Sequence, residues 1–364
     1  MPWSAAAPAA ERHAPRSVHP RALVFPADHG AHPQTRIEWW YVTGEVQSAK
    51  PSGADAGRPV AAANFGFQVT FFRSRTDVAA DHPSRFAAQQ LVFAHAALTD
   101  LKQGRLRHDQ RIARAGFGIA EAAVGDTGVT LRDWHLTRAD AVGTDGGSRY
   151  RTRVISDTAG FGFDFIFDTT QPLLLQGDGG YSRKGPRPEQ ASHYYSQPQL
   201  AVSGTLTRDG IALPVQGSAW LDHEWSDSLL DPSAVGWDWI GMNLDDGSAL
   251  TAFHLRGADG ATVYAGGSFR PAGGAVRNFA ADELRLTPGR LWTSPGSRAR
   301  YPVEWILDTP VGRFRVKTLL DSQELDSRTS TGAIYWEGLS ELQDEQGRRV
   351  GRGYLEMTGY AGRL

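Results

Sequence analysis

One segment of this 364-residue chain indicates the fold class most clearly: Phe161-Gly162-Phe163-Asp164-Phe165-Ile166-Phe167-Asp168. In an extended chain, successive side chains point to opposite faces of the strand. The four phenylalanine rings therefore share one face, and the two aspartates share the other. This period of two predicts a β-strand with one buried face.

Similar alternation recurs at residues 64–72, 91–98 and 249–255. Turn-forming Asp-Gly pairs separate such segments, at 145–146, 178–179, 209–210, 246–247 and 259–260. No long segment has the 3.6-residue apolar period of a helix. The 41 glycines and 11 tryptophans fit many short strands, tight turns and aromatic-filled interiors. We therefore predict an all-β protein.

The length of the chain allows two domains, each with its own core. We predict a flexible leader over residues 1–21, an N-terminal domain over 22–200 and a C-terminal domain over 201–364. Residues 176–199 are rich in Gly, Ser, Pro, Arg and Tyr, which is typical of a connection, and a strand-like pattern resumes at Leu200. That connection is either a lid over a barrel mouth or a plain linker.

Composition excludes several classes of function. A net charge of −2 gives no electrostatic reason to expect nucleic acid as a partner, so an apolar small molecule fits better. The absence of cysteine excludes disulfides, thiolate nucleophiles and cysteine-ligated metals. No apolar stretch approaches the ~20 residues of a membrane-spanning helix, although peripheral contact with a membrane stays open. Ala5-Ala6-Ala7 is compatible with the remnant of an export signal and equally with an ordinary tail.

The densest cluster of polar and aromatic residues covers 217–225 and 236–239. On a strand, Asp222 shares a face with Trp220 and Glu224, whereas His223 and Trp225 share the opposite face. Asp238 points away from both of its tryptophan neighbours. Burial raises the pKa of a carboxyl group and so allows it to act as an acid at neutral pH. The candidate catalytic residues are Asp238, His223 and Asp222; the competing interpretation is that they only stabilise the fold.

Aromatic residues near these clusters are the candidate ligand-binding residues: Trp225, Trp237, Trp239, Tyr194, Tyr195 and Trp40. A structural role is favoured for the cluster at 36–41, where Glu38 is expected to pair with Arg36 or Arg183. The chain contains no pattern typical of a zinc site, a serine-hydrolase elbow or a dinucleotide loop. We therefore predict neither a metal nor a cofactor.

Three clusters together resemble the lipocalin-like carotenoid 1,2-hydratase and AttH family: residues 32–44, residues 175–185, and residues 220–225 with 236–239. The resemblance implies two consecutive calycin-type antiparallel β-barrel domains and a periplasmic or secreted location. It also implies varied activities, including cofactor-free hydration of isoprenoid double bonds, ring formation, and many members labelled only as secreted hydrolases. By the pattern of the family, His223, Trp225 and Asp238 are the positions carried over.

The first functional hypothesis is a cofactor-independent hydratase acting on an isoprenoid or similar apolar substrate. Protonation of a C=C bond creates a carbocation, which needs a positioned acid, aromatic faces and an ordered water. Asp238 or Asp222 would be the acid, Trp225 and Trp237 the aromatic faces, and His223 the group that orients the water or the acid. The alternative is a non-catalytic carrier of a lipid or pigment. A hydrolase or cyclase ranks lower, because no nucleophile motif is present.

Overall fold

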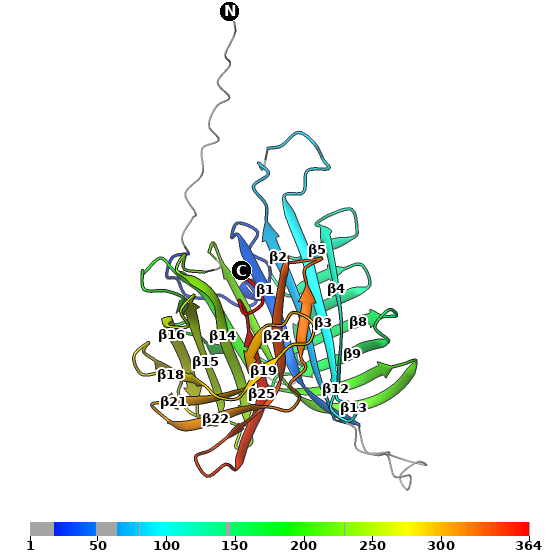
Figure 1. Cartoon of the computed structure of the whole chain (residues 1–364). Coiled ribbons are helices and arrows are strands. Elements are labelled where there is room, and N and C mark those ends of the chain that lie inside the picture. The colour runs from blue at the N-terminus through cyan, green and yellow to red at the C-terminus, as the bar shows by residue number, and fades with distance from the viewer. Residues whose placement is uncertain (1–17, 49–63, 80, 143–145, 229, 364) are drawn as a thin grey trace, which may run out of the picture.

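The computed structural model describes residues 18–48, 64–79, 81–142, 146–228 and 230–363. Nearly all regular structure in these ranges is β-strand (Figure 1), with one helical turn, η1 (Ala27–His29). Within the same ranges, no helix has the length and apolar character needed to cross a membrane. The predicted all-β class is confirmed. Most of the predicted leader, residues 1–17, and Asp145 of one predicted turn lie outside the described residues.

The first sheet forms a nearly closed barrel. Its strand order is β4-β3-β2-β1-β13-β12-β9-β8-β7-β6-β5, with β10 and β11 also paired to β12, and β5 and β6 contact β3 and β4 across the gap. The strands are β1 (Ile37–Ser48), β2 (Asn64–Arg75), β3 (Gln90–Asp100), β4 (Arg105–Arg114), β5 (Ala120–Ala122), β6 (Gly128–Leu131), β7 (Trp134–Asp140), β8 (Ser148–Ser156), β9 (Phe161–Asp168), β10 (Leu174–Leu175), β11 (Tyr181–Arg183), β12 (Ala191–Arg208) and β13 (Ile211–Ser226).

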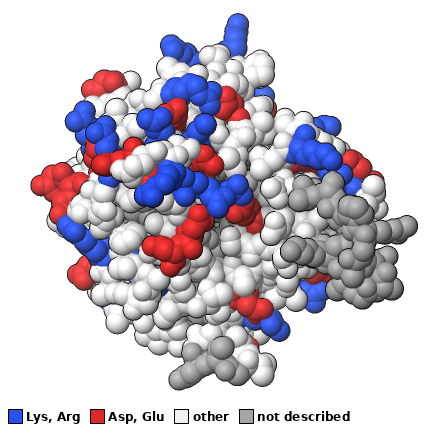
Figure 2. All heavy atoms as spheres, turned by 90° about the horizontal axis from the view of Figure 1, so that it is seen from below, with Lys and Arg blue, Asp and Glu red and all other residues white. Residues whose placement is uncertain are grey.

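The phenylalanine segment forms β9 and has the predicted alternation. All four rings are at most 2% exposed and lie in the core of the barrel. Burial of each ring contributes about 2 kcal/mol to folding. On the outer face, Asp164 and Asp168 form ion pairs with Arg151 and Arg149 of β8. Figure 2 shows one face of the molecule, on which basic and acidic side chains lie next to one another.

The second sheet has the order β17-β16-β15-β14-β25-β24-β22-β21-β18, with β23 paired to β24, and encloses its own core around Trp305, Trp336 and Leu355. A separate hairpin consists of β19 and β20. The strands are β14 (Ala234–Leu244), β15 (Ala249–Gly257), β16 (Thr262–Arg270), β17 (Arg277–Phe279), β18 (Arg285–Pro288), β19 (Leu291–Thr293), β20 (Arg300–Pro302), β21 (Glu304–Thr309), β22 (Gly312–Thr318), β23 (Glu324–Ser327), β24 (Ala333–Gln343) and β25 (Arg349–Met357).

The chain passes from the first sheet to the second between Ser226 and Ala234. The sequence-based boundary near residue 200 instead falls inside β12, which continues across a bulge between Gln197 and Leu200. Much of the expected connection at 176–199 is therefore strand. The predicted leader also extends too far, because Val18 is buried and Arg21 forms an ion pair with Asp28.

The two sheets pack together through faces that point away from their own cores. Strands β1, β2 and β13 of the first sheet contact β14, β24 and β25 of the second. A separate apolar cluster fills part of this interface: Tyr41, Leu174, Trp220, Trp239, Ala249, Phe253, Leu339 and Tyr354. Because side chains alternate along a strand, each of these strands contributes one face to its barrel core and the other to the interface.

Candidate functional site

A cavity of about 470 Å³ lies between the two sheets. This volume is within the range of small-molecule binding sites. Aromatic side chains from both sheets line it: Trp39, Tyr41, Phe72, Phe93 and Tyr194 from the first sheet, and Trp237, Trp239, Phe253 and Tyr335 from the second. The cavity is thus a mainly apolar space with polar groups at a few positions.

Two carboxyl groups in the lining have a pKa close to neutrality. Burial raises the pKa of Asp222 to about 7, although its Oδ1 accepts hydrogen bonds from Ser196 Oγ at 2.5 Å and Trp220 Nε1 at 2.7 Å. Burial also raises the pKa of Glu356 to about 7, and the negative charges of Asp222 and Glu224 add to the effect. Part of the Glu356 surface stays accessible from the cavity, although its carboxyl lies deep in the protein. Both groups exchange protons near pH 7.

These two carboxyls come from opposite walls, Asp222 from β13 and Glu356 from β25. Beside them, Trp239 Nε1 donates a hydrogen bond to the Tyr194 hydroxyl at 3.3 Å. Lys184 Nζ lies 3.2 Å from Glu224 Oε1 and above the rings of Tyr194 and Phe253, at 4.5 and 4.4 Å from their centroids. The ammonium group shows that these ring faces can hold a positive charge.

A second polar group in the lining consists of Gln68, Tyr41 and Glu337. Gln68 Nε2 donates a hydrogen bond to Glu337 Oε2 at 2.5 Å. Burial raises the pKa of Glu337 well above its usual range, and the neighbouring Glu356 raises it further. Burial therefore favours the protonated form of Glu337, which can donate a hydrogen bond.

The structure brings four of the predicted site residues together in this cavity: Asp222, Tyr194, Trp237 and Trp239. Four others, His223, Trp225, Tyr195 and Trp40, point into the interior of the first barrel instead. Adjacent residues on a strand face opposite sides, so His223 cannot share the cavity with Asp222, nor Tyr195 with Tyr194. The expected pairing of Trp225 with Trp237 around one substrate is not formed.

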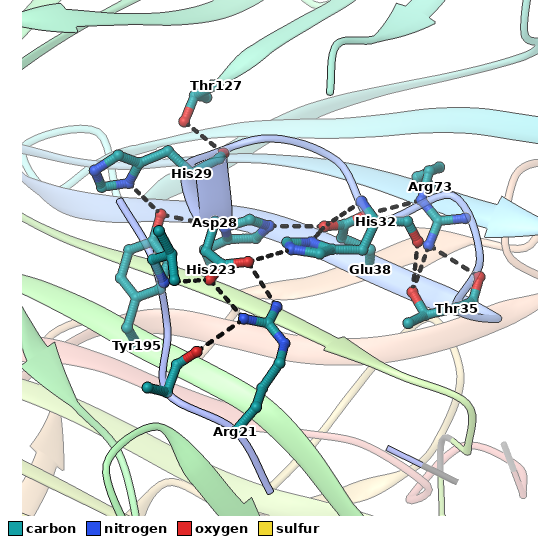
Figure 3. Close-up of polar contacts among 12 residues, drawn as sticks. Arg21, Asp28, His29, His32, Thr35, Glu38, Arg73, Thr127, Tyr195 and His223 are labelled. Atoms are coloured by element: carbon teal, nitrogen blue, oxygen red, sulfur yellow. Dashed lines mark hydrogen bonds and ion pairs between the residues drawn. The ribbon is translucent and has the colours of Figure 1, made fainter. Parts of the chain in front are cut away.

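Inside the first barrel, His223 belongs to a continuous hydrogen-bonded network (Figure 3). Its Nε2 donates to Glu38 Oε1 at 2.9 Å, and its Nδ1 lies 3.1 Å from the Tyr195 hydroxyl. Glu38 also accepts hydrogen bonds from His32 Nδ1 at 2.7 Å and from Arg73 Nε at 2.7 Å. The predicted partners of Glu38, Arg36 and Arg183, are therefore replaced by a different arginine and two histidines.

One group of three potential metal ligands occurs among the described residues: His32, Glu38 and His223, with ligand atoms within 4.8 Å of one another. Glu38 is fully buried and already compensated by the guanidinium of Arg73. Burial opposes the ionisation of Glu38, but hydrogen bonds from His223 and His32 hold its pKa well below the usual range. A cation would have to compete with Arg73, so the cluster fits a structural ion-pair network better than a metal centre.

Asp238 lies in the interior of the second sheet and does not line the cavity. Its Oδ2 accepts hydrogen bonds from His254 Nε2 at 2.7 Å and Arg256 Nε at 3.1 Å, and its Oδ1 accepts one from the Tyr360 hydroxyl at 3.0 Å. The hypothesis that Asp238 is the acid that acts together with the rings of Trp225 and Trp237 does not fit this arrangement, because Trp237 lines the cavity from the opposite face of β14.

Sequence reasoning missed Glu337 and Glu356. Each follows a tyrosine by two positions, in Tyr335-Trp336-Glu337 and Tyr354-Leu355-Glu356, and the two glutamates pair in register across β24 and β25. The repeated Tyr-x-Glu pattern at strand period was the available signal. Its meaning depends on which face of each strand meets the other sheet, and the pattern does not specify this.

The fold defines a lipocalin-like, all-β protein whose two sheets enclose a mainly apolar cavity. A family model described as AttH-like matches residues 16–360, so the chain belongs to the AttH-like family. A crystal structure of a Nitrosomonas europaea protein named for AttH is 47% identical, with a TM-score of 0.83 over 96% of this chain and 100% of that one.

More distant structures share the fold. Kievitone hydratase from Nectria haematococca is 16% identical, with a TM-score of 0.65 over 94% of each chain. CghA is 13% identical, with a TM-score of 0.53 over 93% of this chain and 94% of that one. A search of curated proteins finds no match to the sequence.

Proposed function

We propose that the chain is a cofactor-independent lyase of the hydratase type, which adds water to a C=C bond of an apolar substrate held between the sheets. The observation that carries this proposal is the pair of cavity carboxyls with a pKa of about 7, Asp222 and Glu356, among tryptophan and tyrosine rings. The fold shared with kievitone hydratase supports the same reaction class.

The surroundings of the two carboxyls assign their roles. Asp222 accepts hydrogen bonds from Ser196 and Trp220, which favour its ionised form and suit it to act as the base. Burial favours the protonated form of Glu356. A hydrogen bond from Trp237 opposes this effect, but the nearby negative charges of Asp222 and Glu224 add to it and suit Glu356 to act as the acid. General acid and base groups are most effective when their pKa lies near the working pH.

The reaction follows from these roles. Glu356 donates its proton to the less substituted alkene carbon, and the positive charge develops on the more substituted carbon. The rings of Trp237, Trp239 and Tyr194 stabilise that charge through their faces. Water attacks the cation while the Asp222 carboxylate accepts one water proton. Return of that proton to Glu356 restores both groups, and the net change is addition of one water molecule.

The test uses two alkenes, citronellol and 2-prenylphenol, with product detection by mass spectrometry. We expect the parent chain to form the tertiary alcohol and Glu356→Gln to lose at least ~10²-fold in turnover. Glu121→Gln, which alters an exposed carboxyl of β5, is the matched control and should retain parental turnover. Saturable binding of both alkenes with no hydration product would identify a carrier and refute the enzyme proposal. Hydrolysis of ester analogues would refute it in favour of a hydrolase.

A further inference from the structure

We infer that the cavity recognises a hydroxyl group on its apolar ligand through Tyr41, Gln68 and Glu337. The inference rests on the proposed function, because it defines the substrate class for the same cavity. The ligand is accordingly an apolar alcohol or phenol rather than a pure hydrocarbon.

Three polar atoms of these residues lack a hydrogen-bond partner within the described part of the chain: the Tyr41 hydroxyl, Gln68 Oε1 and Glu337 Oε1. Their residues are 6%, 1% and 2% exposed, and all three line the cavity. Buried polar atoms without partners are rare and costly, so several in one cavity indicate a group that pairs with them.

The three residues are neighbours in space. Gln68 Nε2 contacts Glu337 Oε2 at 2.5 Å, which joins the two sheets at this point. Burial is the main cause of the raised pKa of both Tyr41 and Glu337, and each group also shifts the pKa of the other. The side chains of Tyr41 and Glu337 thus interact, but within the described part of the chain none of the three atoms has a partner at the distance and angle of a hydrogen bond.

The orientation of the Gln68 amide follows from its surroundings. Besides the bond to Glu337, its nitrogen lies 3.3 Å from Thr70 Oγ1 and 3.3 Å from the Tyr335 hydroxyl. The Tyr335 hydroxyl is in turn held by His95 Nδ1 at 2.7 Å. With oxygen atoms around its nitrogen, the amide leaves its Oε1 as the free acceptor.

The free atoms match the hydrogen-bonding capacity of a hydroxyl group. Tyr41 offers one O–H donor, protonated Glu337 offers another through Oε1, and Gln68 Oε1 offers one acceptor. A hydroxyl accepts two hydrogen bonds and donates one, so it satisfies all three atoms. A carbonyl would leave Gln68 Oε1 unpaired, and a hydrocarbon would leave all three unpaired.

The position of this group relative to the catalytic carboxyls limits the substrate further. Glu337 is the cross-strand partner of Glu356 on β25, and directly opposed residues have Cβ atoms about 5 Å apart. The recognised hydroxyl therefore lies near the acid, on the side of the cavity lined by β2 and β24. It anchors the ligand there, while the aromatic rings contact its apolar part.

The experiment is calorimetric titration of the parent chain with two matched pairs. Citronellol is compared with 2,6-dimethyl-2-octene, and 4-phenylphenol with 4-methylbiphenyl. We expect the hydroxyl compound of at least one pair to bind at least tenfold more tightly than its hydrocarbon counterpart, because sites that hydrogen-bond a hydroxyl reject analogues without it. The pair with the larger ratio of affinities shows whether the site prefers an aliphatic alcohol or a phenol.

Variants then attribute the preference to these residues. Tyr41→Phe and Gln68→Met should each reduce the ratio to below threefold and leave hydrocarbon affinity within twofold of the parent, which also reports intact folding. Tyr354→Phe removes a hydroxyl from the same interface outside the cavity lining and should keep the ratio. Equal affinity within both pairs would overturn the inference and indicate a site for water only. A hydroxyl preference without any hydration product would overturn the proposed reaction and leave the hydroxyl site standing.

Discussion

Replacement of Asp222 by Asn changes how stability depends on pH, by an amount that follows from the structure. Burial raises the pKa of Asp222 from 3.8 to about 7. Between these values the folded chain keeps a proton that the unfolded chain has released. The free energy of unfolding therefore falls as pH rises from about 4 to about 7, and the loss is complete above about 7. At about 1.4 kcal/mol per pH unit, the loss is about 4 kcal/mol.

Asn cannot ionise, so Asp222→Asn escapes this loss. The assay is urea denaturation of the parent and the variant at pH 4.5, 6 and 8, followed by tryptophan emission. The difference in free energy of unfolding, variant minus parent, should increase by about 3 kcal/mol between pH 4.5 and pH 8, because part of the unfolded-state titration lies below pH 4.5. A comparison between the two chains cancels the titration of buried groups that Asp222 does not influence. The Glu356→Gln background, used for both chains, removes the neighbouring carboxyl whose pKa Asp222 raises. A difference that is the same at all three pH values would refute the reasoning, because Asp222 would then titrate alike in both states.

Three further outcomes are expected. Glu356→Gln should lose ~10² to 10⁴-fold in turnover with a melting temperature close to that of the parent, measured by product formation and calorimetry; retained turnover would exclude Glu356 as the acid. Asp238→Asn should cost about 3 kcal/mol of stability in urea, since it removes the buried partner of Arg256, yet retain turnover per folded molecule; a stable but inactive variant would contradict its structural role. His223→Ala should lower the free energy of unfolding by ~1 to 3 kcal/mol, because Glu38 and Tyr195 each lose a hydrogen-bond partner, and it should retain turnover per folded molecule. Loss of turnover without loss of stability would show that the catalytic site lies inside the first barrel.

The all-β fold could be predicted because its signal is local. In β9, phenylalanine occupies every second position over eight residues, so one face of the strand carries all four rings and faces the core. The Asp209-Gly210 pair likewise marks the hairpin between β12 and β13, where both residues have positive φ. The domain boundary was harder to predict, because much of the Gly- and Pro-rich segment before Leu200 belongs to a long bulged strand and not to a linker.

The site was predicted in part, because alternation tells which residues share a face but not what that face meets. Asp222 and His223 were correctly placed on opposite faces of one strand, yet the sequence could not show that one face meets the second sheet. The cavity is formed where β1, β2 and β13 contact strands of the second sheet. Some of those strands, such as β24 and β25, lie more than a hundred residues further along the chain. Glu337 and Glu356 gain their raised pKa only from that packing.

The proposed reaction depends on two carboxyl groups in the cavity that titrate near neutrality. The most direct measurement is a pH titration of the chain labelled with ¹³C at its Asp and Glu carboxyl carbons, followed by NMR. Comparison with the spectra of Asp222→Asn and Glu356→Gln assigns the two signals. We expect both carboxyls to titrate with midpoints near pH 7. Midpoints below pH 5 for both groups would contradict the proposed reaction, because neither carboxyl would then carry a proton to donate at neutral pH.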